Sequence, residues 1–211
     1  MALLDDLLPE TRPGLSQLPD VSLVAALRRG AQRFLRESQV WADDLEAFAL
    51  VVGRHTYPLP LPDGARVERI LTVKVNGREI DVQMRVRELR ALADTDGPPT
   101  AWAIFDSQDE QVIAFDRTPR AAEAGFSVAI HASLAITNEA AELPDWIVND
   151  WHDGIVSGAR MELLGQRGTP HYDPDAAARE RFSFSMDVAR AKRVQVSGRH
   201  ALLRAQPRPW V

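Results

Sequence analysis

Residues 126–151 read FSVAIHASLAITNEAAELPDWIVNDW, and they contain the change of hydrophobic period that decides the fold. Apolar side chains recur at every second position from Phe126 to Ile136, which predicts a strand with one buried and one solvated face. After Pro144 the apolar residues recur at helical spacing, and proline is tolerated in the first turn of a helix. The stretch therefore predicts that a β region ends near Thr137 and that a helix follows, ending near Gly165 or Gly168.

A second long helix is predicted before the β region, from about Asp20 to Gln39. Its apolar residues fall on one face, and Asp20 or Ser22 is suited to cap its start. The apolar positions are Val24, Leu27, Ala31, Phe34 and Leu35. The proline- and glycine-containing residues 9–20 predict an extended lead-in.

Between these helices the sequence has the marks of an antiparallel sheet. Asn76-Gly77 separates two alternating runs, and both residues tolerate the positive φ angles of a tight hairpin. Further strands are predicted over 101–105 and 112–115, joined by a polar turn at 106–110. The proline-rich residues 57–62 must be extended.

A last helix is predicted to begin at Asp173-Pro174-Asp175, where an acidic cap precedes proline in the first turn. Its main apolar positions are Ala178, Phe182, Met186, Ala189 and Val196, with Phe184, Val188 and Ala191 widening the face. Gly198 is a natural stop. Residues 199–211 contain arginines, prolines and no acid, and they predict an extended tail.

The predicted architecture is α+β: a helical bundle formed from both chain ends, with an inserted antiparallel β domain and an extended C-terminal tail. A lone amphipathic helix exposes its apolar stripe, so the first helix should pack on the last two. The predicted segments are 1–42 with the first helix, 43–142 as the β domain, 143–198 with the C-terminal helices, and 199–211 as the tail.

Composition restricts the classes of function. The 211 residues carry a formal net charge of −5 and include no cysteine, so a strongly basic nucleic-acid binder and a disulfide framework are not expected. No apolar run approaches the ~20 residues that span a bilayer, and the start of the chain has no signal-peptide pattern. We expect a protein made in the cytoplasm that does not enter membranes.

The sequence offers little for catalysis. The five histidines share no metal-ligand spacing, and no nucleophile elbow or glycine-rich phosphate loop occurs. His152-Asp153 and His171-x-Asp173 are the nearest to ligand pairs, and a surface role suits both better. Asp106 with Asp109 or Glu110 could act as a carboxylate pair, but a solvated turn explains these acids better. We expect no enzyme, no cofactor and no metal site.

Three groups of residues are candidates for contacts. Gly154 and Gly158 lie one turn apart in the predicted helix, which suggests that another backbone approaches there, because glycine otherwise costs roughly 1 kcal/mol per helical site. Arginines on the first helix form either a solvated face or an interface with an acidic partner: Arg28, Arg29, Arg33 and Arg36. The tail could dock on a partner through Arg199, Arg204, Arg208, Trp210 and Val211; Trp210 could equally pack on its own subunit.

Several motifs, in this order, resemble a known family. Residues 51–67 read VVGRHTYPLPLPDGARV and look like the G-x-x-x-Y-x-L-P-x-P-x-G-x-x-V strand-turn-strand of phage adaptors. The first helix followed by Trp41 resembles the start of the family's sequences. The family's C-terminal helices are resembled by Leu143–Trp151, Gly158-Ala159, Pro170–Phe182 and Ala189. The family is the head-to-tail adaptor, or tail tubular protein A, of short-tailed bacteriophages.

The resemblance implies a structural virion protein at the head-to-tail interface. Such adaptors form a ring, typically a dodecamer, below the portal protein. The ring extends the DNA channel to the tail nozzle protein, and double-stranded DNA is retained and passed without sequence-specific binding. The resemblance also implies that the tail from Arg199 docks on the portal. A different class remains open: a carbohydrate-binding β-module for host attachment, with Trp102 and Tyr57 as candidate exposed aromatics.

Overall fold

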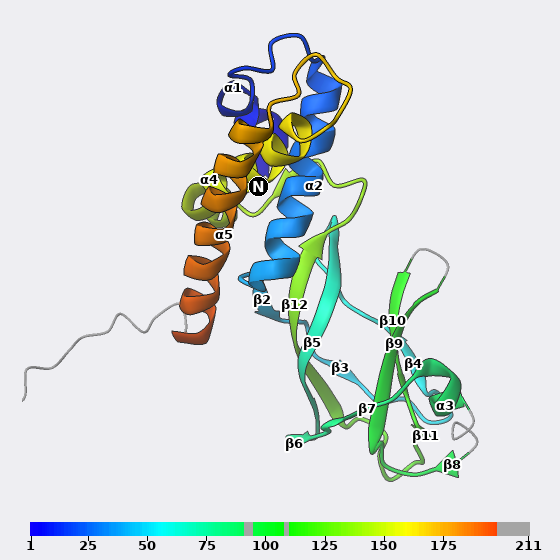
Figure 1. The fold of residues 1–211 in the computed structure, drawn as a ribbon. Coiled ribbons are helices and arrows are strands. Elements are labelled where there is room, and N and C mark those ends of the chain that lie inside the picture. Colours follow the sequence, from blue (N-terminus) through cyan, green and yellow to red (C-terminus); the bar gives the residue numbers. More distant parts are fainter. Residues whose placement is uncertain (91–94, 108–109, 198–211) are drawn as a thin grey trace, which may run out of the picture. The chain divides into compact units, whose positions relative to one another are not determined.

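The structure is a computed structural model that describes residues 1–90, 95–107 and 110–197. The chain forms two compact units (Figure 1). The helical unit contains Met1–Trp41 and the described residues from Asn138 onward, and the β unit contains Ala42–Thr137. The fold is mixed, with long helices and mostly antiparallel sheets, so the α+β class is confirmed.

Three long helices dominate the helical unit: α2 (Asp20–Ser38), α4 (Asp145–Leu164) and α5 (Pro174–Ser197). Figure 1 shows α5 running beside α2 and α4. The unit also holds a short pairing of β1 (Ala2–Leu3) with β13 (Glu142–Leu143), the 3-10 helix η1 (Leu4–Leu7) and the single turn α1 (Leu8–Thr11). No helix in the described part of the chain is long and apolar enough to cross a bilayer.

The first helix has the predicted range, but its start differs from the prediction. Pro19 is the N-cap, and neither Asp20 nor Ser22 caps the helix with its side chain; the Asp20 carboxylate instead pairs with Arg12. The predicted extended lead-in is also wrong in part. Residues 8–11 are helical, and Leu15 is buried, because this segment covers the apolar surface of the long helices.

Aromatic rings fill the centre of the helical unit. Phe34 of α2 lies 5.8 Å from Trp151 of α4 and 6.2 Å from Phe184 of α5, measured between ring centroids, and it meets Phe184 edge-on. All three side chains are buried. The backbone of Trp151 leaves helical geometry (φ −135°, ψ 16°) and kinks α4 at this contact.

The first sheet of the β unit is antiparallel and has the order β2, β12, β5, β6, with β3 also paired to β12. The predicted hairpin is confirmed, since Asn76 (φ 49°) and Gly77 (φ 78°) join β5 to β6. Its strands are β2 (Ala42–Asp44), β3 (Phe48–Ala49), β5 (Ala65–Val75), β6 (Arg78–Glu79) and β12 (Ser127–Ile136).

The second sheet has the order β4, β10, β9, β7, and its β9–β10 hairpin confirms the two predicted strands. Its strands are β4 (Thr56–Pro58), β7 (Val82–Gln83), β9 (Ala101–Ser107) and β10 (Glu110–Phe115). β7 runs parallel to β9, and β8 (Thr95–Asp96) runs parallel to β11 (Arg117–Thr118), so the unit is not wholly antiparallel. The short helix α3 (Val86–Arg90) follows β7.

The strand β12 corrects one prediction. Only its first half alternates between buried and exposed positions, whereas residues 132–136 are buried on both faces. The pairing of β12 with β5 also shifts register on either side of the pair Ala132–Ser133. Ser133 is therefore fully buried, although the sequence pattern predicts it on a solvated face.

Candidate functional site

The motif at residues 51–67 is built around the Tyr57 side chain. Residues 51–54 form a turn, closed by a hydrogen bond from the Arg54 N–H to the Val51 carbonyl, with Gly53 at φ 73°. The Tyr57 hydroxyl accepts a hydrogen bond from the Val51 N–H (3.0 Å) and donates to the Arg54 carbonyl (2.6 Å). Its ring stacks on Phe48, with 5.1 Å between centroids. The tyrosine thus fixes a glycine-containing turn against the sheet.

The second half of the motif connects the two sheets of the β unit. The Leu59 N–H donates to the Gln111 carbonyl, and the Gln111 side chain exchanges two hydrogen bonds with the Val67 backbone on β5. Gly64 (φ 68°) ends the proline segment, and its carbonyl accepts a hydrogen bond from the Thr137 N–H (2.8 Å). The proline-rich segment is therefore held at both ends.

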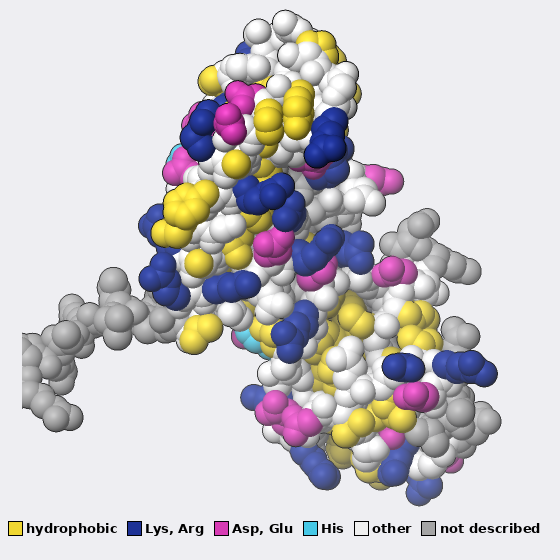
Figure 2. All heavy atoms as spheres, in the orientation of Figure 1, with side chains coloured by type: hydrophobic (Ala, Val, Ile, Leu, Met, Phe, Trp, Pro, Cys, Tyr) yellow, Lys and Arg dark blue, Asp and Glu magenta, His cyan; other side chains and the backbone are white. Residues whose placement is uncertain are grey.

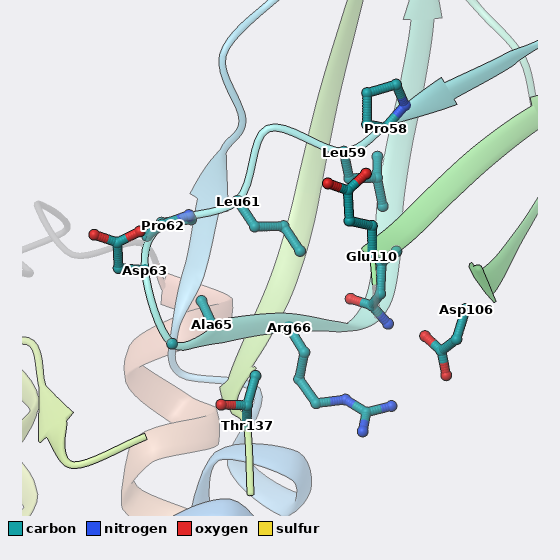
Figure 3. A pocket seen from close by; sticks show the side chains of 12 residues that line it. Pro58, Leu59, Leu61, Pro62, Asp63, Ala65, Arg66, Asp106, Glu110 and Thr137 are labelled. Carbon is teal, nitrogen blue, oxygen red and sulfur yellow. The ribbon is translucent and has the colours of Figure 1, made fainter. Parts of the chain in front are cut away.

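A pocket of about 600 Å³ lies beside this segment (Figure 3). Pro58, Leu59 and Leu61 contribute an apolar part, while Arg66 and the exposed Asp106 and Glu110 contribute charges, as does Asp63. Of the carboxylates considered for acid–base chemistry, Asp106 and Glu110 are thus on an open rim, and Asp109 lies outside the described residues. The pocket therefore combines apolar and charged side chains, as protein contact surfaces do.

The two aromatic residues considered for carbohydrate binding are both buried. Tyr57 is 4% exposed and Trp102 is 5% exposed. The Trp102 indole N–H donates to the Ile80 carbonyl (3.0 Å) within the β unit. A sugar-stacking platform needs an exposed ring face, so neither residue provides one.

The arginines of α2 have partners within the helical unit. Arg28 donates to the Ala140 carbonyl (2.7 Å), and Arg29 pairs with Glu162 of α4 (2.7 Å). Arg33 pairs with Glu37 (2.8 Å), and its guanidinium lies 5.3 Å from the centroid of the Phe184 ring. Arg36 is exposed. Arg28, Arg29 and Arg33 therefore all have contacts within the helical unit of the same copy.

Glycines mark the closest approach of α2 to α4. A Cβ added at Gly30 would lie 2.7 Å from the Ile155 carbonyl oxygen and 2.8 Å from the Ala159 nitrogen. At Gly158 the nearest atoms belong to the Phe184 ring (3.1 Å) and to the Gly30 Cα (3.2 Å), and at Gly154 to the Phe34 ring (2.7 Å). The sequence reasoning missed Gly30, although its place on the apolar face of the first helix was a usable signal.

One group of possible metal ligands occurs among the described residues: Glu10, His152 and Asp153, whose ligand atoms lie within 4.8 Å of one another. All three are at least partly exposed. The nearby Asp187 has a raised pKa, caused mainly by burial and then by the Asp153 carboxylate. The other candidate pair, His171 with Asp173, is not a comparable cluster. Asp173 caps α5, because its side chain accepts hydrogen bonds from the backbone N–H groups of residues 175 and 176.

The last helix presents its faces differently from the prediction. Phe184, Val188 and Ala191 are buried, whereas Phe182, Met186 and Val196 are 71%, 53% and 83% exposed. The predicted main apolar stripe therefore faces outward, and the residues predicted to widen it form the buried face. The tail candidates Arg199, Arg204, Arg208, Trp210 and Val211 lie outside the described residues.

Comparison with known proteins identifies the family. A family profile described as SU10 adaptor protein matches residues 2–206, almost the whole chain. Among curated proteins, none matches the chain. The matched range includes residues of both units. The chain is therefore a member of the SU10 adaptor protein family, a family of phage adaptor proteins.

Proposed function

We propose that copies of this chain form a dodecameric ring below the portal protein of a short-tailed phage. The ring extends the DNA channel, joins the capsid to the tail nozzle protein, and retains and passes the genome. The observation that carries the proposal is the family match over residues 2–206. Adaptor proteins act by joining other virion proteins, and this role requires surfaces rather than a catalytic group.

The build of the chain supports this proposal. The helices α2 and α4 approach at glycine positions, with a Gly30 Cα only 3.2 Å from where a Cβ of Gly158 would lie. Such tight packing makes the helical unit rigid, and a rigid unit suits a subunit that is repeated around an axis. The net charge of −5 also suits a channel through which DNA must slide without strong binding.

In this proposal each segment predicted from the sequence has a role in the ring. Segments 1–42 and 143–198 form the helical bundle of the ring, 43–142 is the inserted β domain, and the tail 199–211 docks on the portal. An extended arm that orders on docking loses conformational entropy, so it needs an anchor. Trp210 and the tail arginines would supply it. The carbohydrate-binding alternative is weakened, because its two candidate aromatic residues, Tyr57 and Trp102, are buried.

The test is to mix the purified chain with portal rings of the same phage and to image the product by electron microscopy. We expect a second ring capping the portal. A variant truncated after Ser197 should fold as the full chain does, with an unchanged circular dichroism spectrum, but bind the portal weakly. A monomer that ignores the portal would contradict the proposal, and retention of glycans on an array would favour the carbohydrate module.

A further inference from the structure

The helix α5 carries apolar side chains on two opposite sides. One side packs inside the helical unit through Phe184, Val188 and Ala191. The other side, which we call the outer face of α5, consists of Ala178, Phe182, Met186, Ala189 and Val196. Figure 2 shows apolar and basic side chains together over this part of the unit. Large apolar side chains gathered on one exposed helix face mark a contact surface.

From Arg179 onward the exposed charges of α5 are all basic, and the exposed Asp175 lies one turn before Ala178. Arg179, Arg181, Lys192 and Arg193 are exposed, as is Arg190, whose guanidinium lies 5.4 Å from the centroid of the Trp151 ring of the same copy. The two acids in this part of α5 are both half-buried, and Glu180 is neutralised by Arg160 of α4 at 2.6 Å. Asp187 lies on the side of α5 that faces Asp153 of α4. A surface that fits the outer face must therefore be apolar in part and acidic.

The same chain carries such a surface at its amino-terminal end. Leu3 is 46% exposed, and the neighbouring Asp5, Asp6 and Glu10 are exposed as well. Glu142, paired in register with Leu3 across β1 and β13, adds a further exposed acid. We call these residues the acidic face. Before Arg12 the sequence contains no lysine or arginine, and the Met1 ammonium group is paired with Asp145 at 2.9 Å.

Within one copy the outer face of α5 and the acidic face cannot contact each other. The outer face of α5 is on the opposite side of the helix from Phe184, which packs against Phe34 and Gly158 in the centre of the unit. The acidic face belongs to elements that pack on α2 and α4, and Arg160 of α4 donates to the Thr11 carbonyl at the end of α1. Complementary surfaces on different parts of one chain produce a head-to-tail contact between copies, which closes into a ring when the rotation allows it.

We propose that the outer face of α5 packs on the acidic face of a second copy of this chain. This inference rests on the proposed function, because it names the surfaces by which neighbouring subunits of the ring meet. Phe182 and Met186 supply the apolar contact, and the flanking cations face Asp5, Asp6 and Glu142 of the neighbour. The contact is heterologous, so every copy uses both surfaces.

The test uses the absence of cysteine, which makes each introduced thiol unique. Copies carrying Met186→Cys are mixed with copies carrying Leu3→Cys, assembled on portal rings, and treated with a short bis-maleimide. We expect linked dimers between the two variants. The matched control replaces Leu3→Cys with Val21→Cys, which is 81% exposed on α2 and should give no such dimers.

A charge exchange gives a second readout. Lys192→Glu with Arg193→Glu should abolish ring formation on the portal, and adding Asp5→Lys with Asp6→Lys in the same chain should restore it. Rings that form normally but link position 186 to itself, to position 21 or only to the portal would overturn this inference and leave the adaptor role standing. Failure of the wild-type chain to form rings on the portal would overturn both.

Discussion

Replacing Gly30 with alanine tests the packing on which the helical unit depends. Gly30 lies on the buried side of α2, where α4 passes without room for a side chain. The added methyl group would lie 2.7 Å from the Ile155 carbonyl oxygen and 2.8 Å from the Ala159 nitrogen. Both are backbone atoms within a helix, so neither can turn aside as a side chain would. The two helices must move apart.

The size of the effect follows from two opposing terms. Overpacking a core costs about 1–3 kcal/mol, and a clash with backbone belongs at the upper end of that range. Alanine is better than glycine in a helix by roughly 1 kcal/mol. The net loss in the free energy of unfolding is therefore about 2 kcal/mol. At Gly158 the nearest atoms are farther from the added methyl group, at 3.1 Å on the Phe184 ring and 3.2 Å at the Gly30 Cα, so Gly158→Ala should cost less.

The assay is urea unfolding followed by circular dichroism at a helical wavelength. All helices longer than five residues in the described structure belong to the helical unit, so the signal reports mainly on that unit. With a slope of about 1–3 kcal/mol per molar urea, Gly30→Ala should lower the midpoint by about 0.7–2 M. Val21→Ala, on the exposed side of the same helix, should change stability by less than about 0.5 kcal/mol.

An unchanged or higher midpoint for Gly30→Ala would refute this reasoning, because it would mean that α2 and α4 do not meet at that point. A smaller effect at Gly30 than at Gly158 would contradict the geometry as well, since it would place the rigid contact at the wrong glycine.

Three further predictions concern single side chains. Tyr57→Phe should lower the free energy of unfolding of the β unit by about 1–3 kcal/mol, because the turn at 51–54 loses a buried hydroxyl partner; the NMR signals of backbone amides in the β unit, followed through a urea titration, measure this, and an unchanged midpoint would contradict it. Asp173→Ala should cost about 1 kcal/mol by removing the cap of α5, whereas Asp173→Ser should recover most of the loss in the same urea assay. Asp187 has a raised pKa, so between its ordinary and its raised pKa the folded chain binds more protons than the unfolded chain, and stability falls as the pH rises through that window. Asp187→Asn should therefore melt at a higher temperature than the wild type at pH 7, with the difference shrinking as the pH falls through the raised pKa; a difference independent of pH would rule this out.

Local signals in the sequence were sufficient for much of the fold. The Asn76-Gly77 hairpin and the start of α5 at Asp173 are each fixed by neighbouring residues, and the structure has both. The cap of α2 was not predictable in the same way, because Asp20 has a competing partner in Arg12, which comes from a separate segment. The Asp20 carboxylate could either cap α2 or pair with Arg12, and the sequence near Asp20 does not determine which of the two occurs.

The faces of α5 could not be predicted from periodicity. Phe182 and Phe184 belong to two different apolar stripes on one helix, and both stripes satisfy a helical repeat. Which stripe is buried depends on the rings of α2 and α4 that receive it, and Phe34 receives Phe184. The same limit applies to Ser133, whose burial depends on what covers β12 rather than on the residue itself.

A cryo-electron microscopy reconstruction of the head–tail junction in virions that carry this chain tests the adaptor role most directly. The account predicts a ring of rotationally repeated copies beneath the portal, each fitted by the helical unit and the β unit, with α5 at the contact between neighbours. Density at the junction that neither unit fits, with the chain found elsewhere in the particle or missing from it, would contradict the account.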